Sequence, residues 1–222
     1  MLLYVLALRM NRKRMTREDS RDQTTQRLLD AAQKLIAKKG LSAASVEDIA
    51  EAAGYTRGAF YSNFSSKGDL FIELLRRDHQ KTNAEFTALR SDELPLEYIQ
   101  ERTRAIYGQL YRDNETFMNW TEARMLAARD TKFRTKLNAL LMEKRAQIAE
   151  FIDYFYRRAG VTPPVPTTAI AMGFMSLVEG VKLSMLSSPT DMTADTAESV
   201  LRLFVDSFMQ LARLHGAGQA KL

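Results

Sequence analysis

The sequence predicts an all-α protein, with a small N-terminal helical unit followed by a larger helical domain. Apolar residues recur at helical spacing along nearly the whole chain of 222 residues, and no segment alternates at period two for long enough to indicate a strand. The chain holds only 5 proline and 10 glycine residues, so little of it can be linker. A chain of this length has room for a small domain fused to a larger one.

The first expected helix carries an apolar stripe over residues 28–36, with lysines off the stripe. Gly40 follows a lysine-rich last turn and is expected to end this helix. A short second helix is expected to begin at Ser45, which resembles a capping box with Asp48 three residues later. Gly54 is expected to end it after about two turns.

Thr56 is placed to cap a third helix that runs through Tyr61, and Phe64 closes this unit before a longer helix through residues 70–75. Proline residues then mark the later boundaries, with Pro95 suited to a first helical turn and Pro163, Pro164 and Pro166 forming the only proline-rich break. The later helices are expected from near residue 95 and over residues 116–128, 131–158, 167–186 and 194–214.

The net charge of +5 lies entirely in the first third of the chain. Residues 9–81 contain 15 Lys or Arg and 10 Asp or Glu, whereas residues 82–222 contain 17 of each. The basic residues Arg9, Arg12, Lys13, Arg14 and Arg17 have no acidic residue among them. Such an arm suits a polyanion, because each Lys or Arg near a phosphate releases a counterion. The alternative is a solvated tail that contacts nothing.

The chain has no cysteine, which excludes disulfides and thiolate metal sites and fits a reducing cytoplasm. Residues 1–8 are apolar, but positive charges follow them instead of preceding them, so a signal peptide is not expected. No stretch approaches about 18 apolar residues, so no membrane segment is expected. A start of translation at Met10 or Met15 instead of Met1 is a hypothesis that the intact mass of the native protein tests.

The segment from Ser45 to Lys67 reads SVEDIAEAAGYTRGAFYSNFSSK, two short helices that meet at a glycine. This is the pattern of a helix-turn-helix, whose second helix presents its N-terminal residues to base edges. Arg57 suits a guanine or a phosphate, and Gly58 has no side chain to keep the backbone away from DNA. Tyr61 lies one turn past Arg57 and suits a phosphate contact. The alternative is that these are ordinary surface residues of a helical bundle.

The pattern over residues 26–75 is more specific than a general helix-turn-helix pattern. A helix with LLDAA and LI, a glycine, and then S-V-x-D-I-A-x-x-A-G-x-T-x-G-x-F-Y-x-x-F-x-x-K-x-x-L strongly resembles the DNA-binding region of the TetR family, over residues 26–75. In such regulators the position of Ser45 caps the first helix of the motif, and the residues at the start of the second helix enter the major groove. Asn63 stands where many relatives carry a larger aromatic residue or histidine, so it could read adenine or contact phosphate. The DNA-binding set implied by the resemblance is Ser45, Thr56, Arg57, Gly58, Tyr61, Asn63 and Lys67.

The resemblance also implies the domain organisation. We expect a basic arm at residues 1–19, a helix-turn-helix DNA-binding domain at 20–66, and a helical ligand-binding and dimerisation domain at 67–222. In this family the last two helices usually pair with those of a second subunit, and small and apolar residues at 173–184 suit close helix approach. The competing explanation is an intramolecular core.

The ligand pocket of such regulators lies among the middle helices. Aromatic residues one helical turn apart there suit a largely apolar or aromatic ligand, with Arg124 or Glu122 as a polar anchor and methionines as adaptable lining. Plain core packing explains the same spacing. The candidate ligand-binding residues are Tyr107, Tyr111, Trp120, Arg124, Phe151 and Phe155.

Enzyme, metal and cofactor functions are not expected. The chain has no cysteine nucleophile, no glycine-rich phosphate loop and no G-x-S-x-G. Its two histidines, His79 and His215, have no spacing partner for a metal, and His79 is expected on a solvated helix face.

The sequence therefore predicts a cytoplasmic, dimeric, ligand-responsive repressor that binds a pseudo-palindromic DNA operator and a small-molecule effector, with no membrane partner. The alternatives are a helical small-molecule binding protein with lapsed DNA binding and an architectural DNA binder. Operator, effector, regulated genes and the sign of regulation do not follow from the sequence.

Overall fold

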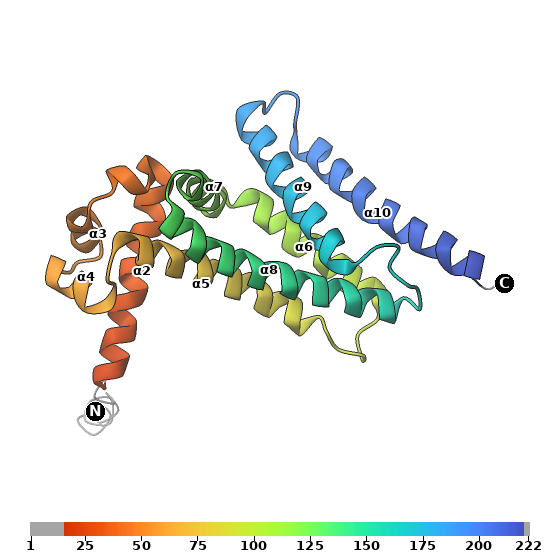
Figure 1. The fold of residues 1–222 in the computed structure, drawn as a ribbon, viewed down its shortest axis with the longest axis horizontal. Coiled ribbons are helices and arrows are strands. Elements are labelled where there is room, and N and C mark those ends of the chain that lie inside the picture. The colour runs from red at the N-terminus through yellow and green to blue at the C-terminus, as the bar shows by residue number, and fades with distance from the viewer. Residues whose placement is uncertain (1–15, 220–222) are drawn as a thin grey trace, which may run out of the picture. The chain divides into compact units, whose positions relative to one another are not determined.

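The computed structural model describes residues 16–219, with only the backbone described at 110, 111, 205 and 208–219. The described residues form helices and turns without any strand, so the prediction of an all-α fold is confirmed (Figure 1). The helices are α2 (Arg17–Ala43), α3 (Val46–Ala52), α4 (Arg57–Asn63), α5 (Lys67–Ala88), α6 (Leu96–Arg112), α7 (Asn114–Arg129), α8 (Thr131–Arg158), α9 (Thr167–Ser187) and α10 (Ala194–Gln219).

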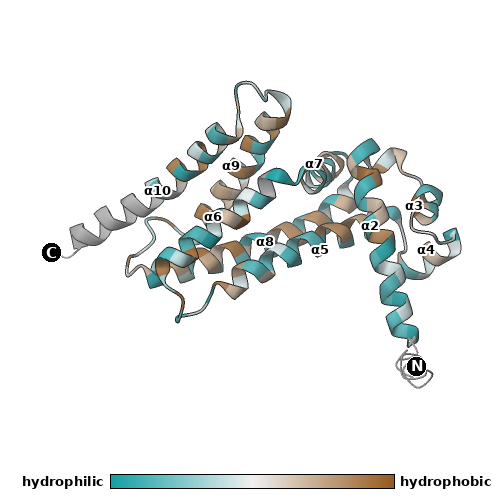
Figure 2. Ribbon diagram, turned by 180° about the vertical axis from the view of Figure 1, so that it is seen from behind, coloured by the Kyte–Doolittle hydropathy of each residue, from teal (hydrophilic) through white to brown (hydrophobic). Residues whose placement is uncertain are grey.

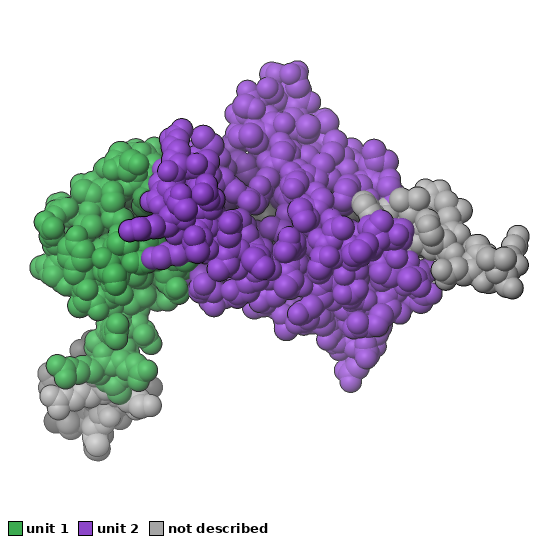
Figure 3. Space-filling view, viewed as in Figure 1, with its two compact units in different colours: residues 1–74 green, residues 75–222 purple. Residues whose placement is uncertain are grey.

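The chain divides into two compact units, residues 1–74 and 75–222, with the division inside α5 (Figure 3). The predicted division into 20–66 and 67–222 would instead fall at the first residue of that helix, and it stays a prediction. Most of the predicted basic arm, including Arg9 and Arg14, lies outside the described residues, as do the three candidate start methionines.

The N-terminal unit is built on one apolar stripe. Leu28, Leu29, Ala32 and Ile36 of α2 are buried, as are Ile49 and Ala50 of α3 and Phe60 of α4. The predicted break at Gly40 is present, with φ 77° and ψ 160°, although helical hydrogen bonding resumes beyond it and α2 ends at Ala43. A left-handed φ of this kind favours glycine, so the break follows directly from the sequence.

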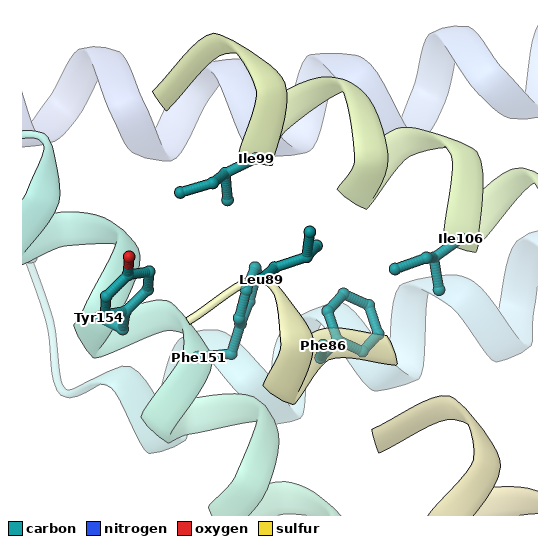
Figure 4. Close-up of a cluster of buried hydrophobic side chains, with 6 residues drawn as sticks. All are labelled: Phe86, Leu89, Ile99, Ile106, Phe151 and Tyr154. Carbon is teal, nitrogen blue, oxygen red and sulfur yellow. The ribbon is translucent and has the colours of Figure 1, made fainter. Parts of the chain in front are cut away.

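The C-terminal unit has its own core where α5, α6 and α8 meet (Figure 4). Its buried members point toward one another from those three helices and from the turn that follows α5, and they are Phe86, Leu89, Ile99, Ile106, Phe151 and Tyr154. The Tyr154 hydroxyl donates to the carbonyl of Ser91 at 2.8 Å, and the Arg158 guanidinium donates to the carbonyls of Asp92 and Leu94. These bonds fix the connection between α5 and α6 against the end of α8.

Helix α9 is the most apolar described element and packs against α8 and α10 (Figure 2). By length and composition alone it is apolar enough to cross a membrane, with a mean hydropathy of 1.5 over 18 residues. Threonine, glycine and serine residues, together with Glu179 and Lys182, interrupt the run, and one such helix is weak evidence of a membrane segment, so the expectation of no membrane segment stays a prediction. Only 28% of that window is buried inside the chain, and Met172, Leu183 and Leu186 are exposed.

Candidate nucleic-acid interface and ligand site

The first helix of the motif, α3, is held by the predicted capping box. The Ser45 hydroxyl accepts from the backbone N–H of Asp48 at 2.9 Å, and the Asp48 carboxylate accepts from the backbone N–H of Ser45 at 3.0 Å. Lys39 of α2 donates to the same carboxylate at 2.7 Å. The Lys39 ammonium and the two bonds to Ser45 lower the pKa of the Asp48 carboxyl to about 2. Ser45 therefore fixes the start of α3, and the bond between Lys39 and Asp48 connects this start to α2.

The turn between α3 and α4 depends on one glycine. Gly54 has φ 76°, which allows the backbone N–H of Tyr55 to donate to the carbonyl of Ala50 at 2.8 Å. Thr56 then caps α4, because its hydroxyl accepts from the backbone N–H of Ala59 at 3.3 Å. The prediction of a glycine turn followed by a threonine cap is confirmed in structure, and the exposed first turn of α4 begins directly after the cap.

Arg57 lies in this first turn between two neighbours. Its guanidinium forms an ion pair with the Glu47 carboxylate of α3, with a nitrogen–oxygen distance of 2.7 Å, and lies 5.5 Å from the ring centroid of Tyr61. The side chains of Arg57 and Glu47 are 64% and 55% exposed, and Tyr61 is also exposed. The arginine is thus oriented by the protein and still accessible. The sequence analysis did not identify Glu47 as part of this site, because nothing in the helix-turn-helix pattern pairs its carboxylate with Arg57.

The fold of the N-terminal unit does not itself require glycine at position 58. A Cβ added at Gly58 would meet only the Thr56 hydroxyl oxygen, at 3.7 Å, which is an ordinary van der Waals distance. Its φ is not in the left-handed range. The expected approach of DNA to this bare backbone stays a prediction.

Two other predicted DNA contacts have partners inside the unit. Asn63 accepts from the Thr25 hydroxyl of α2 at 3.0 Å and donates to the carbonyl of Ala59 at 2.8 Å. The Lys67 ammonium donates to the carbonyls of Leu41 at 2.9 Å and Ala44 at 2.7 Å, where α2 ends. Both side chains connect helices in this structure, and their contacts with DNA stay predictions.

The matches to known proteins cover this same region. The family model described as bacterial regulatory proteins, tetR family, matches residues 28–74. The regulator AcrR of Shigella flexneri is 44% identical over 61 residues, which are 28% of each chain. Residues 28–74 are therefore a TetR-family region. The matches with two further curated regulators cover 50% of their length, so what the relatives do as whole proteins does not transfer directly.

Solved structures of transcriptional regulators resemble the chain over most of its length. The complex of SmeT with triclosan has a TM-score of 0.65 at 20% identity, over 83% of this chain and 90% of that one; another structure names SmeT as a repressor from Stenotrophomonas maltophilia. FadR of Bacillus subtilis in complex with stearoyl-CoA has a TM-score of 0.67 at 17% identity, over 81% and 97%. At these identities the likeness shows that the C-terminal unit shares the fold.

Three of the predicted ligand residues come together. Tyr107, Phe151 and Phe155 all join the cluster where α5, α6 and α8 meet. The Phe86 ring centroid lies 5.3 Å from that of Tyr107 and 4.9 Å from that of Phe151, and Tyr107 also meets Phe174 of α9 at 4.7 Å. Phe151 is largely buried among these rings.

Trp120 and Arg124 have other neighbours. The Lys144 ammonium of α8 lies 4.3 Å from the Trp120 ring centroid, and Arg124 of α7 forms an ion pair with Glu179 of α9. The predicted anchor Arg124 is therefore engaged with a carboxylate in this structure. The side chain of Tyr111 lies outside the described residues. The ligand-binding role of the predicted set stays a prediction.

A buried polar group lies nearby that the sequence analysis did not mark. His79 is only 5% exposed, so its expected position on a solvated face was wrong, since residues of α8 such as Lys144 and Gln147 cover it. Burial and the Lys144 ammonium lower the pKa of His79. Burial raises the pKa of the Asp78 carboxyl to about 6 and lowers that of the Lys144 ammonium to about 8. The side chain of Gln147 interacts with His79, and among the described residues Asp78 Oδ2 is buried without a hydrogen-bond partner.

Two open grooves lie elsewhere in the C-terminal unit, around Tyr154 and Arg157 of α8. Their volumes are about 430 and 270 Å³. Arg90, Asp92, Glu150, Asp153 and Arg158 complete their lining. None of these residues belongs to the predicted ligand set, whose described members pack against other side chains.

Proposed function

We propose that this protein is a ligand-responsive transcriptional regulator, acting as a repressor that binds a pseudo-palindromic operator as a dimer. The observation that carries the proposal is the first turn of α4. There an exposed Arg57 and a Gly58 that the fold does not require follow a threonine cap. Arginine suits bidentate pairing with guanine, and a glycine admits close approach of the DNA backbone. We also propose that the protein lies in the cytoplasm, where it would reach its operator.

The exposed apolar surface of α9 supports the dimer. Leu183 is 53% exposed, Met172 is 50% exposed, and Leu203 of α10 is 69% exposed. Exposed apolar patches of this kind mark interaction surfaces, and a two-fold dimer buries the same patch of both subunits. One recognition helix also gives little specificity alone, whereas a dimer reads two half-sites about one helical turn apart.

The effector is proposed to be a small, largely apolar molecule held among α5, α6, α7 and α8. Tyr107, Phe151 and Phe155 supply aromatic contact, and Trp120 and Arg124 supply a second, partly polar surface. Similar structures hold triclosan in SmeT and stearoyl-CoA in FadR, both with large apolar parts. Effector and operator affinities would be coupled reciprocally, by about 1–3 kcal/mol.

A footprint of the purified protein on the DNA upstream of its own gene, at near-physiological salt, tests the proposal. We expect a protected, roughly two-fold symmetric site that Arg57→Ala abolishes, because that change removes the base contact and not the fold. Protection spread without sequence preference contradicts sequence-specific regulation. An equal loss of binding to random DNA would show that Arg57 contacts phosphate alone.

A further inference from the structure

We propose that Glu47 is a specificity-determining residue of the DNA surface, acting together with Arg57. The inference rests on the proposed function, since it concerns how α4 selects its DNA sequence. Glu47 Oε1 lies 2.7 Å from a terminal nitrogen of Arg57, and both side chains are mostly exposed. While the pair is closed, DNA that approaches Arg57 also approaches the Glu47 carboxylate.

The pair is held from two sides and is easily opened. Tyr61 lies one helical turn after Arg57, and its ring faces the guanidinium at 5.5 Å from the centroid. Exposed ion pairs of this type contribute little to stability, so a bidentate guanine can replace the carboxylate. The pairing thus orients Arg57 before DNA arrives without preventing its transfer to a base.

A carboxylate at a DNA surface discriminates between DNA sequences because some groups in the major groove repel it. It accepts hydrogen bonds from the amino groups of cytosine and adenine in the major groove, but phosphates and the acceptor edges of guanine and thymine repel it. Glu47 therefore penalises binding to most sequences and is compensated only where an amino group stands beside the guanine that Arg57 contacts. The carboxylate lowers affinity for random DNA more than affinity for the operator.

Selection from a randomised duplex pool with the full-length protein and with Glu47→Gln tests this, because the pool itself reveals the sequence that each protein prefers. Dissociation constants and their salt dependence are then measured on the sequence selected by the wild type and on its scrambled version. Glu51→Gln is the matched control, since Glu51 is also exposed on α3 and makes no side-chain ion pair with Arg57.

We expect Glu47→Gln to tighten binding to the scrambled duplex about 5-fold and to the selected duplex by less than about 2-fold, since removing the carboxylate relieves repulsion mainly where no amino group faces it. The salt dependence on scrambled DNA should steepen by about one ion, because Arg57 becomes free for a phosphate. The base preference next to the guanine should relax in the pool selected by the variant. Glu51→Gln should leave the ratio of the two affinities unchanged.

Equal changes on both duplexes, or an equal effect of Glu51→Gln, would overturn the role of Glu47. A changed melting temperature with unchanged selectivity would show that Glu47 only stabilises the start of α3, which also overturns it. If the wild type itself selects no sequence, the proposed function fails and this inference fails with it. A selective wild type with an equally selective Glu47→Gln variant refutes the inference alone.

Discussion

The two units of the chain differ in whether their polar side chains have hydrogen-bond or ion-pair partners. In the N-terminal unit Arg57, Asn63 and Lys67 all have partners on neighbouring helices, and the helix starts are capped by Ser45 and Thr56. In the C-terminal unit the Asp78 carboxyl is buried with one oxygen lacking a hydrogen-bond partner, and burial raises its pKa. The first arrangement is complete before DNA arrives. The second leaves hydrogen-bonding capacity inside a helical bundle.

This difference has an energetic meaning. Satisfied caps and ion pairs hold the DNA-binding surface in one geometry, which suits recognition of a rigid duplex. A buried polar atom without a partner destabilises a fold by about 1–3 kcal/mol. Burial of the Asp78 carboxyl therefore lowers the stability of the C-terminal unit at α5. Four substitutions break or sharpen this comparison, beginning with the largest expected effect.

Leu183→Glu tests whether the C-terminal unit supplies association while the N-terminal unit supplies recognition. If α9 pairs with a second copy, burying two unpaired carboxylates raises the dimer dissociation constant at least about 100-fold, or about 3 kcal/mol. Sedimentation equilibrium measures this. Met142→Glu is the control, since Met142 is 61% exposed on α8, outside the proposed interface. A Leu183→Glu variant that stays as dimeric as the control would remove α9 from the interface.

Asp78→Asn tests the stability that the C-terminal unit gives up. The folded pKa of Asp78 is about 6, above its ordinary value of 3.8, so the folded state binds the proton more tightly than the unfolded state. The native carboxyl therefore destabilises the fold progressively as pH rises from about 4 to 6, and by at most about 3 kcal/mol above that. Asp78→Asn should raise the free energy of unfolding by urea at pH 7.5 and change it little at pH 4.

The exposed carboxyl variant Asp191→Asn is the control for general charge effects. A gain for Asp78→Asn that is the same at both pH values would show that burial of this carboxylate is not the cause.

Lys67→Met tests whether this lysine stabilises the fold of the N-terminal unit or only binds DNA. Its ammonium donates to the carbonyls at the end of α2, so its loss should lower the free energy of unfolding by about 1.5–3 kcal/mol. Lys38→Met, at an exposed position of α2, should have little effect. Unchanged stability with a flatter salt dependence of DNA binding would assign Lys67 to a phosphate instead.

Gly58→Ala separates folding from DNA binding. Because an added Cβ meets only an ordinary contact, the variant should unfold at the same or slightly higher free energy, by up to about 1 kcal/mol. DNA binding should weaken by about 10-fold, or about 1.4 kcal/mol, if the backbone approaches DNA closely there. Gly108→Ala in α6 also has free space and should leave DNA binding unchanged. Full DNA affinity in Gly58→Ala would mean that α4 does not approach DNA at this residue.

The sequence predicted what depends on near neighbours along the chain. The capping box of Ser45 and Asp48, the cap at Thr56 and the glycine breaks at 40 and 54 all involve residues within one turn, and each is present. The bond from Thr25 to Asn63 spans 38 residues and that from Lys67 to Leu41 spans 26, so no local pattern marks them. The burial of His79 was not predicted for the same reason. The sequence of α5 alone indicates an amphipathic helix with a polar histidine, whereas the residues that cover His79 come from α8, far along the chain.

The association state of the DNA complex tests the central claim most directly. The mass of the complex between the protein and a duplex selected by it is measured by sedimentation, with the Arg57→Ala variant and a scrambled duplex in parallel. Two protomers on a two-fold symmetric duplex are predicted, with affinity reduced by about 1–3 kcal/mol in the variant and lower still on the scrambled duplex. A single protomer bound equally well to both duplexes would contradict a dimeric reader of DNA sequence.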